Sequence, residues 1–248
     1  MKYEVIVQGF PGKRLSGSLA WSSATYIEAG KEKILFDTGG PNVRSSIKKH
    51  LQAKGVAPEE ITMLIISHFH DDHVRNFDYF PKAQIFLHEI DANWAATEPE
   101  DFAVPLGLLD IIKKTGRLEL VKQDGELIPG VETMLVPGHT PGSMAVFLHH
   151  DSMPVTALTG DAVKNLAELA TGVVSHSKNP EVSAASIKKI RDKAQIVIPG
   201  HDRILEITKD RIIAKTAARQ TIVVPANVVD KGERFLELTL EPTWLSKE

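Results

Sequence analysis

The chain has 248 residues, of which 42% are hydrophobic, and its formal net charge is −3. This length suits one large α/β domain or two small ones, and the hydrophobic content is sufficient for a complete core, which argues against a disordered chain. The absence of cysteine excludes disulfides, a thiol nucleophile and thiolate metal ligands.

The N-terminal residues 1–7 enter a strand pattern directly and lack the features of a signal peptide. No apolar stretch of the sequence is long enough to span a bilayer. We therefore expect a soluble, cytoplasmic protein with no membrane partner. Both charge signs are spread along the chain and no basic run occurs, so we expect no nucleic-acid partner.

A polar loop at residues 11–23 follows the first strand and carries Trp21. We interpret Trp21 either as an aromatic lid packed on the edge of the core or as a substrate contact. Paired strands are predicted at 24–28 and 33–36. Apolar residues that recur every four positions from 43 to 51 then predict a helix.

The densest polar cluster follows the apolar run at residues 63–66, and it reads His68-Phe69-His70-Asp71-Asp72-His73. Such a run, closed by polar residues, is typical of a buried strand that ends at its C-terminal edge, where ligand sites of α/β folds gather. Imidazole and carboxylate are the ligands that suit zinc and similar divalent metals. His68 and His70 can point the same way from the strand end, while Asp72 and His73 can face a second metal.

The middle of the chain is predicted to hold a strand at 84–87 and a mostly helical segment at 88–115, with breaks at Pro99 and Pro105. Short strands of a second sheet are then expected at 117–121, 126–128, 131–136, 143–148 and 155–159.

The last third is expected to begin with helix or loop at 162–171. Asn179 and Pro180 predict the start of a helix, because asparagine caps helices and proline fits the first turn. The remaining elements expected are strands at 195–198 and 203–207, a helix from 209 to about 220, and a strand at 235–240.

Four further residues of ligand type stand at matching positions. Asp37, Asp161 and His201 each end an apolar run, and His139 lies between turn signals. Together with the His68–His73 cluster, and in this order along the chain, they resemble the metallo-β-lactamase superfamily of dinuclear metallo-hydrolases. The resemblance covers most of the chain, from Asp37 to His201.

The resemblance implies an α/β fold, a four-layer αββα sandwich of two mixed β-sheets with outer helices. The sequence favours the same architecture, because both halves place strands before helices and each sheet would cover the other. We expect a single domain over residues 1–248, with a C-terminal extension from about residue 217.

The resemblance also implies two divalent metal ions. His68, His70 and His139 would bind one metal. Asp72, His73 and His201 would bind the other, and Asp161 would bridge the two. Zinc is expected by default, although the same ligands suit iron and manganese.

A hydroxide shared by the two metals would then attack the substrate. Asp72 would also accept a hydrogen bond from the hydroxide, which makes it a candidate catalytic residue. The carboxylate of Asp37 would accept the free ring N–H of a ligand histidine and fix its orientation.

Three functions are compatible with this pattern. The first is a hydrolase of a small ester, lactone or thioester, since N-acyl homoserine lactonases and glyoxalase II thioesterases resemble the motifs. The second is a phosphodiesterase or nuclease, and the third is a mononuclear iron dioxygenase of the same superfamily. The acidic charge and the short interval between Asp161 and His201 disfavour the second, and the complete ligand set disfavours the third.

The substrate itself is not specified by the motifs, beyond the expectation of a small molecule. Lys164 stands where the lactonases carry a tyrosine, three residues after the bridging aspartate. It would either bind an anionic group of the substrate or be a solvated helix charge. The oligomeric state stays open, with a homodimer as one alternative.

Overall fold

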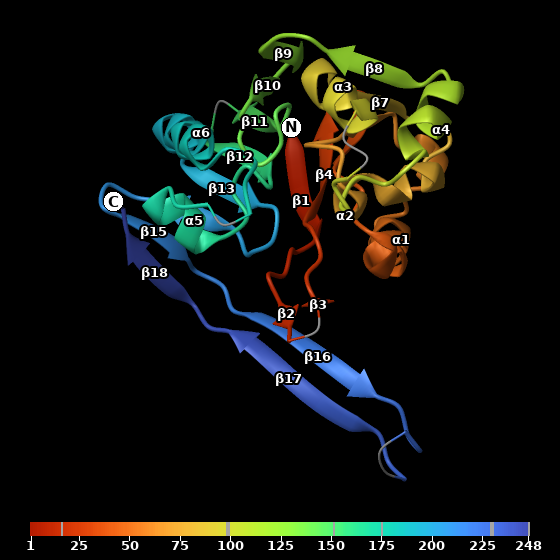
Figure 1. The fold of residues 1–248 in the computed structure, drawn as a ribbon, viewed down its shortest axis with the longest axis vertical. Coiled ribbons are helices and arrows are strands. Elements are labelled where there is room, and N and C mark those ends of the chain that lie inside the picture. The colour runs from red at the N-terminus through yellow and green to blue at the C-terminus, as the bar shows by residue number, and fades with distance from the viewer. Residues whose placement is uncertain (16, 98–99, 151, 175, 229–230, 248) are drawn as a thin grey trace.

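The computed structural model describes residues 1–15, 17–97, 100–150, 152–174, 176–228 and 231–247. Two mixed β-sheets lie face to face in this part of the chain, and helices cover the outer side of each (Figure 1). The expected four-layer αββα sandwich is therefore confirmed. No helix of the described residues is long and apolar enough to cross a membrane.

The first sheet has the strand order β1-β4-β5-β6-β7-β8. Its strands are β1 (Lys2–Val7), β4 (Ala24–Ala29), β5 (Glu32–Phe36), β6 (Met63–Ile65), β7 (Gln84–His88) and β8 (Leu118–Val121). The pairs β1/β4 and β4/β5 are antiparallel, and the strands from β5 to β8 run parallel.

Strand β8 corrects the expectation that residues 117–121 belong to the second sheet. It pairs with β7 in parallel, with Ile85 opposite Leu118. A helical crossover between β7 and β8 returns the chain to the same sheet, as parallel strands require. The predicted break at Pro99 lies outside the described residues.

The second sheet has the order β18-β15-β14-β13-β12-β11-β10-β9. Its strands are β9 (Gly125–Ile128), β10 (Val131–Leu135), β11 (Met144–His150), β12 (Met153–Gly160), β13 (Ile196–Pro199), β14 (Leu205–Ile207), β15 (Arg211–Ala214) and β18 (Thr243–Ser246). Only β12 and β13 pair in parallel among its described strands.

The helices form the two outer layers (Figure 1). On the side of the first sheet lie α1 (Arg44–Ala53), α2 (Asp71–Val74), α3 (Glu89–Thr97) and α4 (Leu108–Lys114), and on the side of the second lie α5 (Leu166–Thr171) and α6 (Pro180–Lys193). Short 3₁₀ helices span Pro41–Val43, Pro58–Glu60 and Arg75–Tyr79. The predicted start of α6 is confirmed, because the Asn179 side chain accepts a hydrogen bond from the Val182 N–H.

Buried side chains pack between every pair of layers. Ile34 and Ile65 of the first sheet share one cluster with Val146 and Leu158 of the second, which fills the space between the sheets. Separate clusters join each sheet to its own helices. Removal of this apolar surface from water is the main stabilising contribution to the sandwich.

The C-terminal part corrects the expected helix at 209–220. Residues Arg211–Ala214 form β15, and β16 (Ala218–Val224) pairs with β17 (Arg234–Leu240) in a hairpin that projects from the body (Figure 1). The segment is a strand because β14 and β18 supply backbone hydrogen-bonding partners on both sides. Ile212 and Ala214 are both buried, since alternate side chains of a strand share one face. A second small hairpin joins β2 (Lys13–Arg14) and β3 (Gly17–Ser18).

Candidate metal centre

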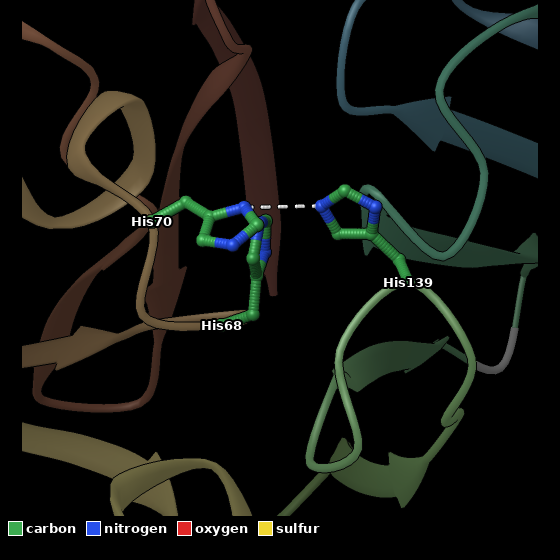
Figure 2. A group of neighbouring side chains, drawn as sticks. All are labelled: His68, His70 and His139. Atoms are coloured by element: carbon green, nitrogen blue, oxygen red, sulfur yellow. Dashed lines mark hydrogen bonds between the residues drawn. The ribbon is translucent and has the colours of Figure 1, made fainter. Parts of the chain in front are cut away.

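We call the first sheet with its helices the first half of the molecule, and the second sheet with its helices the second half. Three histidines converge where these two halves meet. His68 and His70 follow β6, and His139 lies in the loop between β10 and β11 (Figure 2). Nδ1 of His70 is 3.0 Å from Nε2 of His68 and 3.1 Å from Nε2 of His139. The ring nitrogens of these three histidines thus surround one point.

These distances match the edges of a metal's coordination shell. Zinc–nitrogen bonds of ~2.0–2.1 Å place two tetrahedral ligands about 3.3 Å apart. The imidazoles are also buried, so their nitrogens have little access to water. The three-histidine group therefore has the donor set and spacing of a divalent metal site.

A second group contains Asp72 and His73 at the start of α2 and His201 after β13. Oδ2 of Asp72 is 3.4 Å from Nε2 of His201 and 3.7 Å from Nε2 of His73. The Asp72 side chain is 41% exposed, whereas the two histidines are buried. One carboxylate oxygen and two ring nitrogens thus face a second point beside the first.

Asp161, which follows β12, lies between the two groups. Its Oδ1 is 3.2 Å from Nε2 of both His73 and His201, and its Oδ2 is 3.4 Å from Nε2 of His139. Oδ1 of Asp161 and Nε2 of His73 are buried without a hydrogen bond from any described residue. Because unpaired buried polar atoms are costly, this pair fits a bound cation.

Contacts from outside the two groups hold the rings of four of the five histidines, namely His68, His73, His139 and His201. Asp37, which follows β5, accepts a hydrogen bond from Nδ1 of His73 at 2.8 Å. The Asp37 carboxylate also accepts the N–H and the hydroxyl of Ser67, and that hydroxyl is 3.0 Å from Nδ1 of His68. Asp37 therefore holds the ring of His73, and its role beside a metal ligand, which the resemblance implied, stays a prediction.

Backbone carbonyls lie against the two candidate histidine ligands from the second half. Nδ1 of His201 is 2.9 Å from the carbonyl oxygen of Trp21, and Nδ1 of His139 is 3.3 Å from that of His176. His176 has a positive φ of 60°, an uncommon conformation that turns its carbonyl towards His139. The remaining ring nitrogen of each histidine is left to face the centre.

Burial keeps the three-histidine group neutral. It holds the pKa of His68 well below its ordinary value and lowers that of His139 to about 3, so both rings offer lone pairs at neutral pH. Burial also opposes protonation of His73, but the carboxylates of Asp72, Asp37 and Asp161 outweigh it and raise the pKa of His73. Burial disfavours the charged form of Asp161, yet His201, His73 and His139 hold its pKa well below the usual range.

A cavity of about 870 Å³ opens onto both groups. Asp72, His139, Asp161 and His201 lie at its lining, together with the cationic side chains of Lys13, Lys164 and Lys178. Lys178 forms an ion pair of 3.0 Å with Asp101, which lies on the other half of the molecule. The cavity lining also contains the carboxylates of Asp71, Asp72, Asp101 and Asp161, so the lysines provide local positive charge within a lining of both signs.

Lys164 is not the solvated helix charge that was one of the two alternatives for it. Its side chain is 14% exposed, and Nζ lies 3.1 Å from Oε1 of Glu168, whose side chain is 4% exposed. Lys164 lies at the cavity wall, so its role as a substrate contact stays a prediction.

The side chain of Trp21 points elsewhere. Its indole stacks on Phe10 with ring centroids 4.9 Å apart, and its Nε1 donates to the carbonyl of Gln8. Ala20 lines the cavity above the ligands, whereas Trp21 lines a neighbouring one. The predicted substrate contact thus gains no support, while the Trp21 carbonyl holds His201.

The sequence analysis missed Ser67 and Asp91. Ser67 directly precedes His68, the first candidate ligand. This adjacency is a signal from which its contact with the site could have been predicted. Asp91 lies in α3, is fully buried, and bonds to both histidine loops. No local pattern marks it, because its partners are distant in sequence.

Comparisons with known proteins agree with the fold. The family model described as the Metallo-beta-lactamase superfamily matches residues 22–201. The Mus musculus protein named Metallo-beta-lactamase domain-containing protein 1 is 28% identical over 77% of this chain and 67% of its own length. An N-acyl homoserine lactonase of Bacillus thuringiensis is 26% identical over 61% of this chain and 60% of its own length.

A solved structure of a metallo-beta-lactamase-like protein from Thermotoga maritima has a similar fold. It aligns with a TM-score of 0.67 at 18% sequence identity and covers 83% of this chain and 99% of that chain. Since the matched family model spans most of the chain and contains all seven candidate ligands, the chain belongs to the metallo-β-lactamase superfamily of metallo-hydrolases.

Proposed function

We propose that the protein is a dinuclear metal-dependent hydrolase of a small ester, lactone or thioester. The observation that carries this proposal is the position of Asp161, whose two oxygens face different ligand groups. His68, His70 and His139 would hold one divalent ion, and Asp72, His73 and His201 the other. Zinc is the ion we expect, since histidine and carboxylate suit it.

Two such ions, when bound, supply a water of lowered pKa and a Lewis acid for the scissile carbonyl. The protein's own residues would accept a hydrogen bond from the water and orient the histidine ligands. Asp72, with its half-exposed carboxylate, would accept a hydrogen bond from the attacking water. Asp37 and the Trp21 carbonyl would keep the rings of His73 and His201 in the ligating orientation.

We further propose that the substrate is small and carries a negative or strongly polar group. The cavity volume of about 870 Å³ suits a small molecule, and Lys13, Lys164 and Lys178 lie along its lining. The same lysines favour small phosphodiesters as a second candidate class. Nucleic acid is not expected as a partner, and a cytoplasmic location and a homodimer also remain proposals.

The test combines metal analysis with a substrate panel. Purified protein should contain about two equivalents of metal, and a chelator should abolish its hydrolysis of a lactone, thioester or carboxyl ester until zinc is restored. Activity on small phosphodiesters alone would select the second class. One iron per chain, with oxygen consumption on a persulfide, would contradict hydrolysis and favour the dioxygenase.

A further inference from the structure

Asp91 in α3 joins the two halves of the molecule beside the three-histidine group. It is completely buried, and its two carboxylate oxygens bond to different halves. Oδ2 accepts the backbone N–H of Phe69 at 2.6 Å, in the first half. Oδ1 accepts the hydroxyl of Thr140 at 2.5 Å and the N–H of Gly142 at 3.3 Å, in the second half.

Each of these contacts lies next to a ligand. Phe69 stands between His68 and His70, and Thr140 directly follows His139. Gly142 packs so closely on α3 that a Cβ at this position would lie 2.1 Å from the backbone nitrogen of Asp91. The loop that carries His139 is therefore held against α3 as well as against the Asp91 carboxylate.

We propose that Asp91 is a positioning residue that sets the spacing of His68, His70 and His139 across the two halves. This inference rests on the proposed metal centre. It concerns one of the two metals, because the second group has other supports: His73 is held by Asp37 and His201 by the Trp21 carbonyl.

The chemistry of a carboxylate suits this role better than that of a neutral side chain. A carboxylate only accepts hydrogen bonds, and three donors point at Asp91. Burial raises the pKa of Asp91 to about 6 although these bonds oppose the shift, so the group is mostly ionised at neutral pH. Hydrogen bonds to an ionised acceptor are stronger than neutral ones, which favours a rigid connection.

The first experiment is Asp91→Asn, which keeps the shape but turns one acceptor into a donor. The amide must then face either the Phe69 N–H or the second-half donors, and one connection is lost. Stepwise Zn²⁺ titration against a chromophoric chelator should show that the affinity of one site falls by about tenfold or more. Anomalous scattering should assign the lost occupancy to the three-histidine group, with the other site within about twofold of wild type.

A matched pair of variants keeps the test valid if Asp91→Asn does not fold. Thr140→Val removes the hydroxyl that Asp91 accepts and should weaken the same site, whereas Thr140→Ser retains a hydroxyl and should restore its affinity. Thr133→Val is the control, because Thr133 is similarly buried but donates to the Gly125 carbonyl instead. It should leave both affinities unchanged.

Equal weakening of both metals, or no weakening in any Asp91 or Thr140 variant, would overturn the inference. Failure of the proposed function is distinguishable, since wild-type protein would then bind fewer than two equivalents. A wild type with two metals and an unchanged Asp91→Asn variant would reject the positioning role alone.

Discussion

At the scale of single residues, Asp161 is the point on which both ligand groups depend. It is the carboxylate that approaches His139 on one side and His73 and His201 on the other. Its position after β12 places it at the end of a strand in the centre of the second sheet. A change at this residue should therefore affect both proposed metal positions at once.

We predict that Asp161→Asn lowers kcat/KM by about 100-fold or more and weakens at least one metal, because the amide presents a donor where an anionic bridge is needed. Metal analysis and steady-state hydrolysis measure both effects. Asp192→Asn removes an exposed carboxylate of α6 and should change neither. Unchanged turnover and metal content in Asp161→Asn would contradict the bridging role.

Lys164 offers a second prediction at this scale. Lys164→Ala should raise KM more than it lowers kcat, the pattern expected when binding common to ground and transition states is lost. It should also cost about 3 kcal/mol of stability, since the buried Glu168 carboxylate loses its cation.

The double substitution Lys164→Ala, Glu168→Gln separates the two effects. It should recover stability, because no buried carboxylate is left unpaired, and keep the raised KM. Lys188→Ala, at a side chain that is 67% exposed, should behave as wild type. A normal KM in both Lys164 variants would remove this residue from the substrate site.

At the scale of elements, the β16–β17 hairpin stands apart from the body (Figure 1). Its strands pair with each other from Ala218 to Leu240, whereas β18 beyond it belongs to the second sheet. The buried Arg203, next but one to His201, donates to the carbonyls of Leu240 and Glu241 at the root of the hairpin. The root is thus connected to the metal centre, and beyond it Gln220 lines the cavity that Trp21 also lines.

We predict that replacing residues 220–238 by a short turn leaves metal content and turnover within about twofold of wild type, since the remaining strand ends lie as close as a hairpin turn requires. Truncation of the whole segment from residue 218 should instead lower the melting temperature and promote aggregation. It removes β18 and leaves β15 as an unprotected edge. The same melting temperature and the same turnover in both deletion variants would contradict the distinction between the projecting hairpin and β18.

At the scale of the whole molecule, the candidate metal centre bridges the two halves. The first half supplies His68, His70, Asp72 and His73, and the second supplies His139, Asp161 and His201. Ions held by ligands from both halves would bind the assembled sandwich much better than the unfolded chain. They should therefore stabilise the relative position of the sheets.

We predict that metal removal lowers thermal stability reversibly. A ligand at 100 times its dissociation constant stabilises the folded state by about 2.7 kcal/mol per site. Differential scanning calorimetry with a chelator, and after return of Zn²⁺, measures the change. Asp161→Asn should show a smaller chelator effect, and an identical melting temperature with and without metal would argue against the bridging centre.

Local pattern was sufficient for much of this protein. Of the seven candidate ligands, four lie in the cluster that follows the apolar run at residues 63–66, Asp161 and His201 each end an apolar run, and His139 stands between turn signals. Most strands and helices follow from their periodicity. The strand at residues 235–240 was predicted from its alternation and the start of α6 at Pro180 from its capping residues, and both are present. Ligand type and chain order also indicated the family before any geometry was known.

Only the tertiary structure decided which distant segments meet. Strand β8 joined the first sheet, and the segment at 211–214 became a strand, because partner strands far away in sequence completed their hydrogen bonds. Asp91 connects Phe69 with Thr140 through contacts that have no periodicity. Short-range sequence pattern reports the preference of a segment for helix or strand, whereas sheet partners and buried hydrogen bonds depend on how the whole chain packs.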